Sequence, residues 1–159
     1  MQYVEDVSFL YDALNVAERV SGIDKDVYLW IQHEGSITHS TSKQKISDKC
    51  AAWLWAIRKE MSYVQSDVNM MFVRAVRSRA YNHTFILLYN SFAYLSPKET
   101  KYYISELKKI DAYPFEFGEY FISDAVLKYR VLHWFMNKYV LWMTCCYGKS
   151  FIGKLKRKE

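Results

Sequence analysis

The segment SPKETKYYISELKKI, from Ser96 to Ile110, carries the clearest helix-start signal in the chain. Ser96 is a favourable N-cap residue, Pro97 suits the first helical position, and Glu99 stands three residues after Ser96, as a capping box requires. The pattern predicts a helix that ends near Ile110. A loop should follow, because Pro114 disfavours helical geometry at the residue before it.

Long helices are also predicted on both sides of this segment. The chain of 159 residues contains only 5 Gly and 2 Pro, which favours long helices over a turn-rich sandwich or barrel. Gly148 is expected to end the last helix, and a break near Asn82-His83 in the second is left open. The three predicted helices run from a cap at Ser47 or Asp48 to about 64, from about 66 to 95, and from about 123 to 146.

The beginning of the chain follows a different pattern. Apolar residues at helical spacing predict a helix over residues 5–20. The segment from Val27 to Ile31 is β-branched and aromatic and too short for a helix, so it predicts a strand. The polar segment 40–49 is typical of a linker. We therefore expect a mainly α protein in two parts, residues 1–42 and a helical bundle with a basic tail over residues 43–159.

An ordered series of short motifs lies within residues 3–40. It consists of an acidic pair at a helix start, Ile-Asp and Val-Tyr around the start of the strand, and Gly-Ser-Ile-Thr after it. This order and spacing resembles the C-terminal part of the catalytic domain of family 2 glycosyltransferases, which are inverting enzymes with the GT-A fold. The motifs stand here as Glu5-Asp6, Ile23-Asp24, Val27-Tyr28 and Gly35-Ser36-Ile37-Thr38. On this resemblance, residues 1–42 are the helix-strand remnant of an α/β catalytic domain.

The resemblance implies roles for four residues. Asp6 would match the general base that deprotonates the acceptor hydroxyl, and Glu5 would help to position that base or the acceptor. His33 and Ser36 would approach the donor diphosphate and stabilise its leaving charge. Ile31 stands where the family commonly has Arg, which is a departure in the diphosphate-binding segment.

The resemblance also implies that part of the enzyme is supplied from elsewhere. GT-A enzymes bind the nucleotide sugar through an N-terminal region and an Asp-x-Asp metal motif. The string Asp24-Lys25-Asp26 follows the expected base instead of preceding it, and we interpret it as a turn. We therefore expect the nucleotide sugar and a divalent Mn or Mg ion to be held by a missing N-terminal half, which is then a partner of this chain. The chain alone is expected to hold no cofactor or metal and to transfer no sugar to a glycan or lipid-linked acceptor.

The end of the chain is basic. Residues 148–159 hold five basic groups and one acid, whereas residues 1–147 hold seventeen basic and sixteen acidic groups. An apolar and aromatic face precedes this tail, and the combination predicts contact with an anionic membrane surface. A frayed polar end of an ordinary bundle helix is the alternative. The predicted face is Val131, Leu132, Phe135, Tyr139, Trp142 and Met143, and the predicted contact residues are Lys149, Lys154, Lys156, Arg157 and Lys158.

Charge and composition restrict the other interpretations. The nearly neutral body argues against a nucleic-acid partner, and a homodimer is left open. No signal peptide and no uncharged stretch of membrane-spanning length is recognised, so a cytoplasmic protein is expected, peripheral at most at the inner face of the plasma membrane. The three Cys predict free thiols, and His83 and His133 predict core or interface positions. The rival interpretation of the whole chain is a non-catalytic helical interaction or membrane-surface module.

Overall fold

The computed structural model describes residues 5–19, 21, 42–66, 69–116 and 126–155. Every regular element within these ranges is an α-helix, and the prediction of a mainly α fold is confirmed. The predicted strand at 27–31 lies outside the described residues. The helices are α1 (Glu5–Val16), α2 (Lys43–Ser66), α3 (Met70–Tyr94), α4 (Pro97–Lys109), α5 (Val126–Asn137) and α6 (Tyr139–Leu155).

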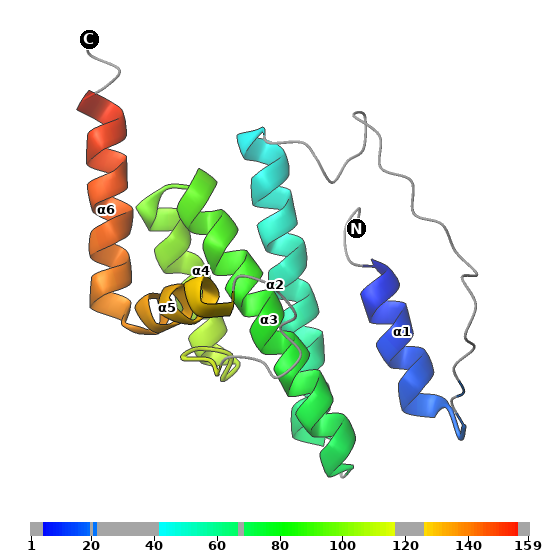
Figure 1. Ribbon diagram of the computed structural model, residues 1–159. Coiled ribbons are helices and arrows are strands. Elements are labelled where there is room, and N and C mark those ends of the chain that lie inside the picture. Colours follow the sequence, from blue (N-terminus) through cyan, green and yellow to red (C-terminus); the bar gives the residue numbers. More distant parts are fainter. Residues whose placement is uncertain (1–4, 20, 22–41, 67–68, 117–125, 156–159) are drawn as a thin grey trace.

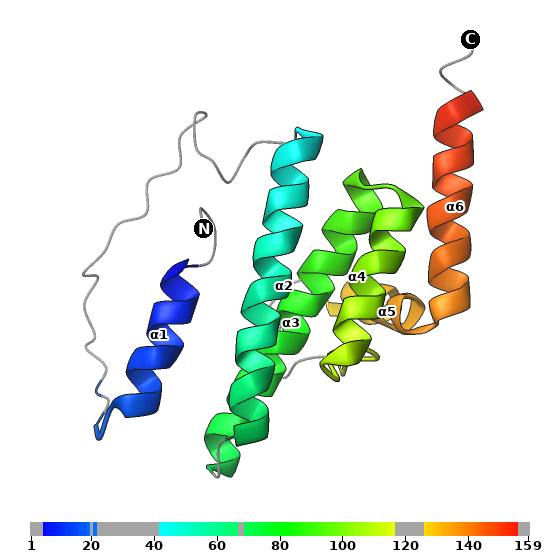
Figure 2. The same ribbon diagram turned by 180° about the vertical axis from the view of Figure 1, so that it is seen from behind.

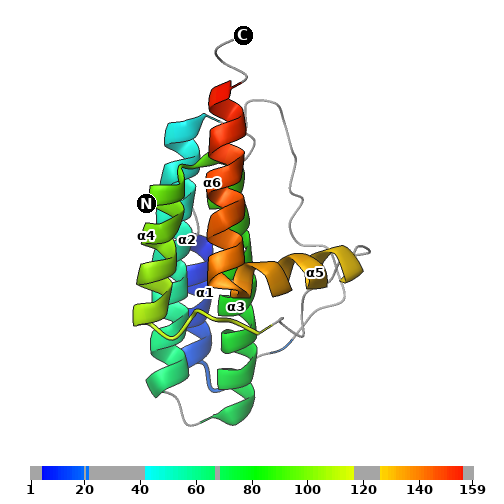
Figure 3. The same cartoon turned by 90° about the vertical axis from the view of Figure 1, so that its left-hand side faces the viewer.

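Helices α2, α3 and α4 form the centre of the fold (Figure 1). α2 and α3 lie side by side, α4 packs on α3, and α6 packs on α4. α1 lies beside α2, on the side away from α4 and α6, as the views from the front and from behind both show (Figure 2). α5 runs crosswise to α6 and leads into its first turn (Figure 3).

The core forms where the apolar sides of the three central helices meet. The larger buried apolar residues of α2 recur every three or four positions, which places them on one side of the helix; they are Ile46, Cys50, Leu54, Ile57 and Met61. α3 lies between its neighbours and is buried on more than one side, because its contacts with α2 and α4 enclose it. The fully or nearly fully buried apolar residues include Ile46, Cys50, Leu54, Ile57, Met61, Ala80, Leu87, Leu88, Ile104 and Leu107.

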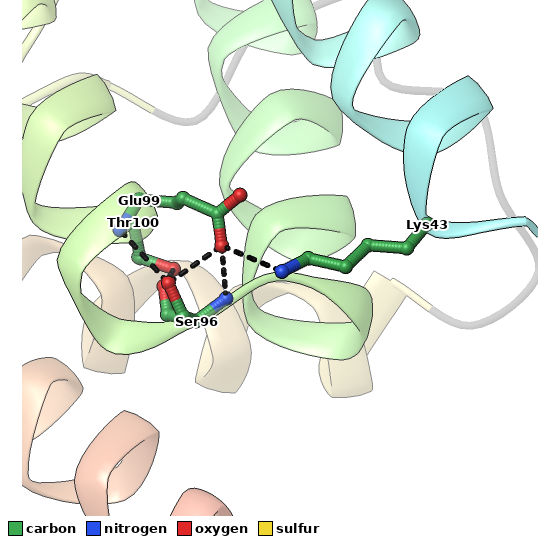
Figure 4. Close-up of polar contacts among 4 residues, drawn as sticks. All are labelled: Lys43, Ser96, Glu99 and Thr100. Atoms are coloured by element: carbon green, nitrogen blue, oxygen red, sulfur yellow. Dashed lines mark hydrogen bonds and ion pairs between the residues drawn. The ribbon is translucent and has the colours of Figure 1, made fainter.

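The start of α4 agrees closely with the prediction (Figure 4). The Ser96 N–H donates to Glu99 Oε2 at 2.8 Å, and the Glu99 N–H donates to Ser96 Oγ at 3.3 Å. Thr100 Oγ1 donates to the Ser96 carbonyl at 3.2 Å, and Lys43 Nζ lies 3.5 Å from Glu99 Oε2. The hydroxyl hydrogen bond from Ser96 and, more weakly, the charge of Lys43 hold the pKa of Glu99 below its usual value. The capping box therefore also joins the first residue of α2 to α4.

The start of α2 and the end of α1 differ from the prediction. α2 begins at Lys43, so the predicted linker at 40–49 is wrong from Lys43 onward and neither Ser47 nor Asp48 is the cap. The Ser42 carbonyl accepts from the Ile46 N–H at 3.0 Å. Burial of Ile46 in the core stabilises this first turn as part of the helix. α1 ends at Val16, four residues earlier than predicted.

α3 runs without interruption through Asn82 and His83, so the chain does not take the break left open there. Both side chains are buried, which agrees with the core or interface position predicted for His83.

The predicted last helix is two helices. The chain turns at Lys138, whose N–H donates to the Phe135 carbonyl at 3.1 Å, and α6 then continues through Gly148 instead of ending there. The turn divides the predicted aromatic face. Trp142 and Met143 point into the core with 2% and 6% exposure, and the Trp142 ring lies 4.7 Å from the Phe92 ring.

Candidate functional site

The proposed acidic pair lies at a helix start, as the sequence predicts. Glu5 and Asp6 are the first two residues of α1, the end of a helix whose backbone dipole favours negative charge. His33 and Ser36, the other two residues of the predicted catalytic edge, lie outside the described residues. The structure therefore provides the backbone setting of the pair and leaves its predicted chemistry untested.

α1 is attached to the helical domain through Asp12. Lys59 Nζ of α2 donates to Asp12 Oδ2 at 2.5 Å, and the Tyr63 hydroxyl donates to Asp12 Oδ1. These hydrogen bonds, first that of Lys59, hold the pKa of Asp12 below its usual value. Burial and then the bond to Asp12 raise the pKa of Tyr63 to about 12. The Lys59 ammonium also lies 5.7 Å from the centre of the Trp55 ring. The Asp12 side chain is more than half exposed, so these bonds orient α1 on α2 and add little stability.

The core contains one buried acid–histidine pair. Glu60 of α2 is 0% exposed and His83 of α3 is 2% exposed. His83 Nδ1 lies 2.8 Å from Glu60 Oε1 and 3.0 Å from Oε2. The Trp53 ring packs on the imidazole at 4.6 Å. The predicted core position of His83 is confirmed.

Glu60 was not predicted from the sequence, although its place in the apolar repeat of α2 indicated a buried carboxylate. It stands three residues after Ile57, on the buried side of α2, where a carboxylate requires a partner. A charged residue in the apolar repeat of a helix is the pattern that would have identified it. Because the pair is enclosed by the core, it is placed to hold α2 and α3 together and is shielded from any dissolved substrate.

A second polar cluster anchors the loop after α4. Asn137 pairs with both backbone groups of Phe115: its Oδ1 accepts from the N–H at 3.0 Å and its Nδ2 donates to the carbonyl at 2.6 Å. His133 Nε2 lies 2.7 Å from the same carbonyl and 2.8 Å from Asn137 Nδ2. The Tyr113 hydroxyl donates to the Met136 carbonyl at 2.7 Å, and the Tyr113-Pro114 peptide is cis. The cluster fixes the end of α5 against the loop.

Lys149 has a role within the chain. Its ammonium donates to the Phe92 carbonyl at 2.6 Å and to the Ala93 carbonyl, and it lies 5.1 Å from the centre of the Phe92 ring. These carbonyls belong to the last turn of α3, where a cation suits the negative end of the helix dipole. Partial burial lowers the pKa of Lys149.

The other predicted tail contacts are less completely described. Lys154 lies in the last turn of α6, and Lys156, Arg157 and Lys158 lie outside the described residues. Membrane contact by the tail stays a prediction.

An open apolar groove lies along α6. Its volume is about 610 Å³, and Gly148 opens it because a β-carbon at that position would meet no atom within 4 Å. The groove is lined by Tyr139, Val140, Met143, Thr144, Tyr147, Gly148 and Phe151. Exposed apolar side chains also lie on α5, where Leu127, Val131 and Trp134 recur at helical spacing.

The cysteines and the acidic residues offer little other chemistry. Cys50 and Cys146 are buried free thiols whose pKa values burial raises to about 12 and about 11, and Cys145 is exposed, so the predicted free thiols are confirmed. Among the described residues, no three His, Cys, Asp or Glu side chains are grouped so as to hold a metal ion.

No helix of the described part of the chain is long and apolar enough to cross a membrane.

Comparison of the chain with protein-family models, with curated proteins and with solved structures found no match.

Proposed function

We propose that this chain is the C-terminal portion of an inverting family 2 glycosyltransferase that acts in polysaccharide biosynthesis. Residues 1–42 would be the edge of the catalytic domain, and residues 43–159 a helical domain attached to it. The intact enzyme would transfer a sugar from a nucleotide-sugar donor to a saccharide or lipid-linked acceptor in the cytoplasm. The N-terminal half would hold the donor and its divalent cation, so the chain alone would be inactive.

The ordered motif series within residues 3–40 is the observation that carries this proposal. The position of Glu5 as the first residue of α1 is in keeping with it, because the family's acidic pair opens a helix. The contact of Asp12 with Lys59 and Tyr63 supports a helical domain that is attached to the catalytic edge. Asp6 would remove the acceptor proton, Glu5 would assist it, and His33 and Ser36 would stabilise the diphosphate.

Replacement of Asp6 by Asn in the native gene product tests the role of the base. Removal of a general base lowers turnover by about 10²- to 10⁴-fold, while binding of the nucleotide should be retained because the carboxylate acts on the acceptor. Glu18→Gln is the matched control, since Glu18 is an exposed acid that follows α1. Normal polysaccharide synthesis by the Asp6→Asn variant would refute the assignment.

A non-catalytic helical interaction module is the second candidate. The core of α2, α3 and α4 favours it, because these helices bury their apolar sides against one another, and the buried core cluster among the described residues begins at Ile46. Calorimetric titration of the native gene product with UDP and GDP in the presence of Mn²⁺ separates the two candidates. Heat of binding supports the glycosyltransferase, and no heat with either nucleotide supports the module.

A further inference from the structure

Helices α5 and α6 both carry large apolar side chains that are exposed. Leu127, Val140 and Phe151 are 77%, 72% and 64% exposed. α4 shows the usual pattern of a surface helix, with exposed Lys98 and Lys101 on its outward side. Apolar side chains gathered on an otherwise folded surface mark a contact region. We call the exposed residues Leu127, Val131, Trp134, Val140, Tyr147 and Phe151 the α5–α6 surface.

The charge of the C-terminal segment that bears the α5–α6 surface indicates what kind of partner would fit it. Residues 126–159 contain eight basic groups and one acid, Glu159, whereas residues 1–125 contain fourteen basic and sixteen acidic groups. The segment that bears the α5–α6 surface therefore carries a formal charge of +7, and residues 1–125 carry −2. A partner complementary to this segment is both apolar and anionic.

An anionic lipid bilayer combines these two properties. Lys138 Nζ lies 5.9 Å from the centre of the exposed Trp134 ring, so a cation and an amphipathic ring stand together at the turn between the helices. Indole rings and lysine stems are favoured at the boundary between lipid headgroups and acyl chains. Polysaccharides and nucleic acids also attract cations, but they give no reason for exposed Leu127 and Val140.

We propose that the α5–α6 surface docks on an anionic lipid bilayer, with its apolar side chains entering the acyl region and its cations meeting the headgroups. The groove beside Gly148 is open and apolar, and so is suited to acyl chains. The contact is interfacial, since helices of this kind lie in the surface of the bilayer. Lys149 contributes less than its charge indicates, because its ammonium already meets carbonyls of α3.

Flotation of the full-length chain with vesicles tests the proposal. The vesicles contain phosphatidylcholine with about one third phosphatidylglycerol, and vesicles of pure phosphatidylcholine serve as the neutral comparison. We expect the chain to float with the anionic vesicles at low salt and to be largely released at high salt. No flotation with the anionic vesicles at low salt would overturn the proposal.

Two sets of variants separate the apolar and the cationic contributions. Leu127→Ser, Val140→Ser and Phe151→Ser together, and Lys128→Glu with Lys138→Glu, should each weaken binding by at least about tenfold. All five side chains are exposed, so urea unfolding should show a native-like midpoint. The matched controls are Met70→Ser with Met71→Ser and Lys98→Glu with Lys101→Glu, which change exposed residues of the same kinds on α3 and α4.

The remaining outcomes each decide the question. Flotation that survives the serine substitutions and is lost only with the charge reversals would reduce the contact to charge attraction and overturn the proposal. A chain that sediments as a dimer, becomes monomeric with the serine substitutions and never floats would assign the surface to a second copy instead. The proposal rests on α5 and α6 and not on the glycosyltransferase assignment, so vesicle binding and nucleotide binding fail independently.

Discussion

The buried pair of Glu60 and His83 should be coupled energetically. Their side chains are almost fully enclosed, and His83 Nδ1 lies within 3.0 Å of both carboxylate oxygens. Glu60→Leu would leave the imidazole N–H buried without an acceptor, which lowers the free energy of unfolding by about 1–3 kcal/mol. His83→Phe would keep a ring beside Trp53 but leave the carboxyl group alone in the core, which lowers it by about 3–5 kcal/mol.

The double variant is the decisive measurement. Replacing both partners by apolar residues of similar volume is often close to neutral, so Glu60→Leu with His83→Phe should unfold within about 1 kcal/mol of the wild type. Urea unfolding of the four proteins, followed by circular dichroism, gives the free energies. Glu18→Leu is the control, because Glu18 is exposed and its loss should have little effect. A double variant that loses the sum of the two single losses would refute the reasoning.

Three further changes test helix ends and the interior of α6. Gly148→Ala should raise the free energy of unfolding by about 0.5–1 kcal/mol, because Gly148 is helical and open space surrounds its α-carbon; a loss of stability in urea would contradict this. Lys149→Met, which keeps the stem beside the Phe92 ring, should lower it by about 0.3–1 kcal/mol through loss of the cation at the end of α3, and no change in the urea midpoint would contradict that. The pKa of Glu99 is lowered below 4.5, so its stabilising effect is present above pH 4.5 and is lost as the pH falls through its folded pKa. Glu99→Gln should therefore flatten the acid side of the stability profile measured by unfolding at several pH values, and an unchanged slope would contradict the role of the capping box.

The helix boundaries show which parts of the fold were accessible to sequence reasoning. α4 was predicted nearly to the residue because Ser96, Pro97 and Glu99 act on one another within a single turn. The division of the last helix at Lys138 was missed, because the side chain of Asn137 pairs with the backbone of Phe115 across a separation of 22 residues. Gly148 was predicted to end the last helix, but α6 continues through it to Leu155.

The candidate site, like the helix boundaries, was predicted from the sequence only in part. The sequence identified the acidic pair Glu5-Asp6 at a helix start, and α1 does begin there. It also identified a basic end of the chain, but it assigned Trp142 and Met143 to the same outward face as Tyr139. Helical periodicity shows which residues share a side of a helix; it does not show which side the neighbouring helices cover.

The sequence by itself determined the helical class, the capping box of α4 and the unequal distribution of charge. All three depend on composition or on residues within one helical turn of each other. Only the tertiary structure decided that Glu60 meets His83, that Asp12 meets Lys59, and that Lys149 caps α3. These partners stand 23, 47 and 57 residues apart, and they come together because the helices bury particular sides. The packing of α6 on α4 likewise turned Trp142 inward and left the α5–α6 surface outward.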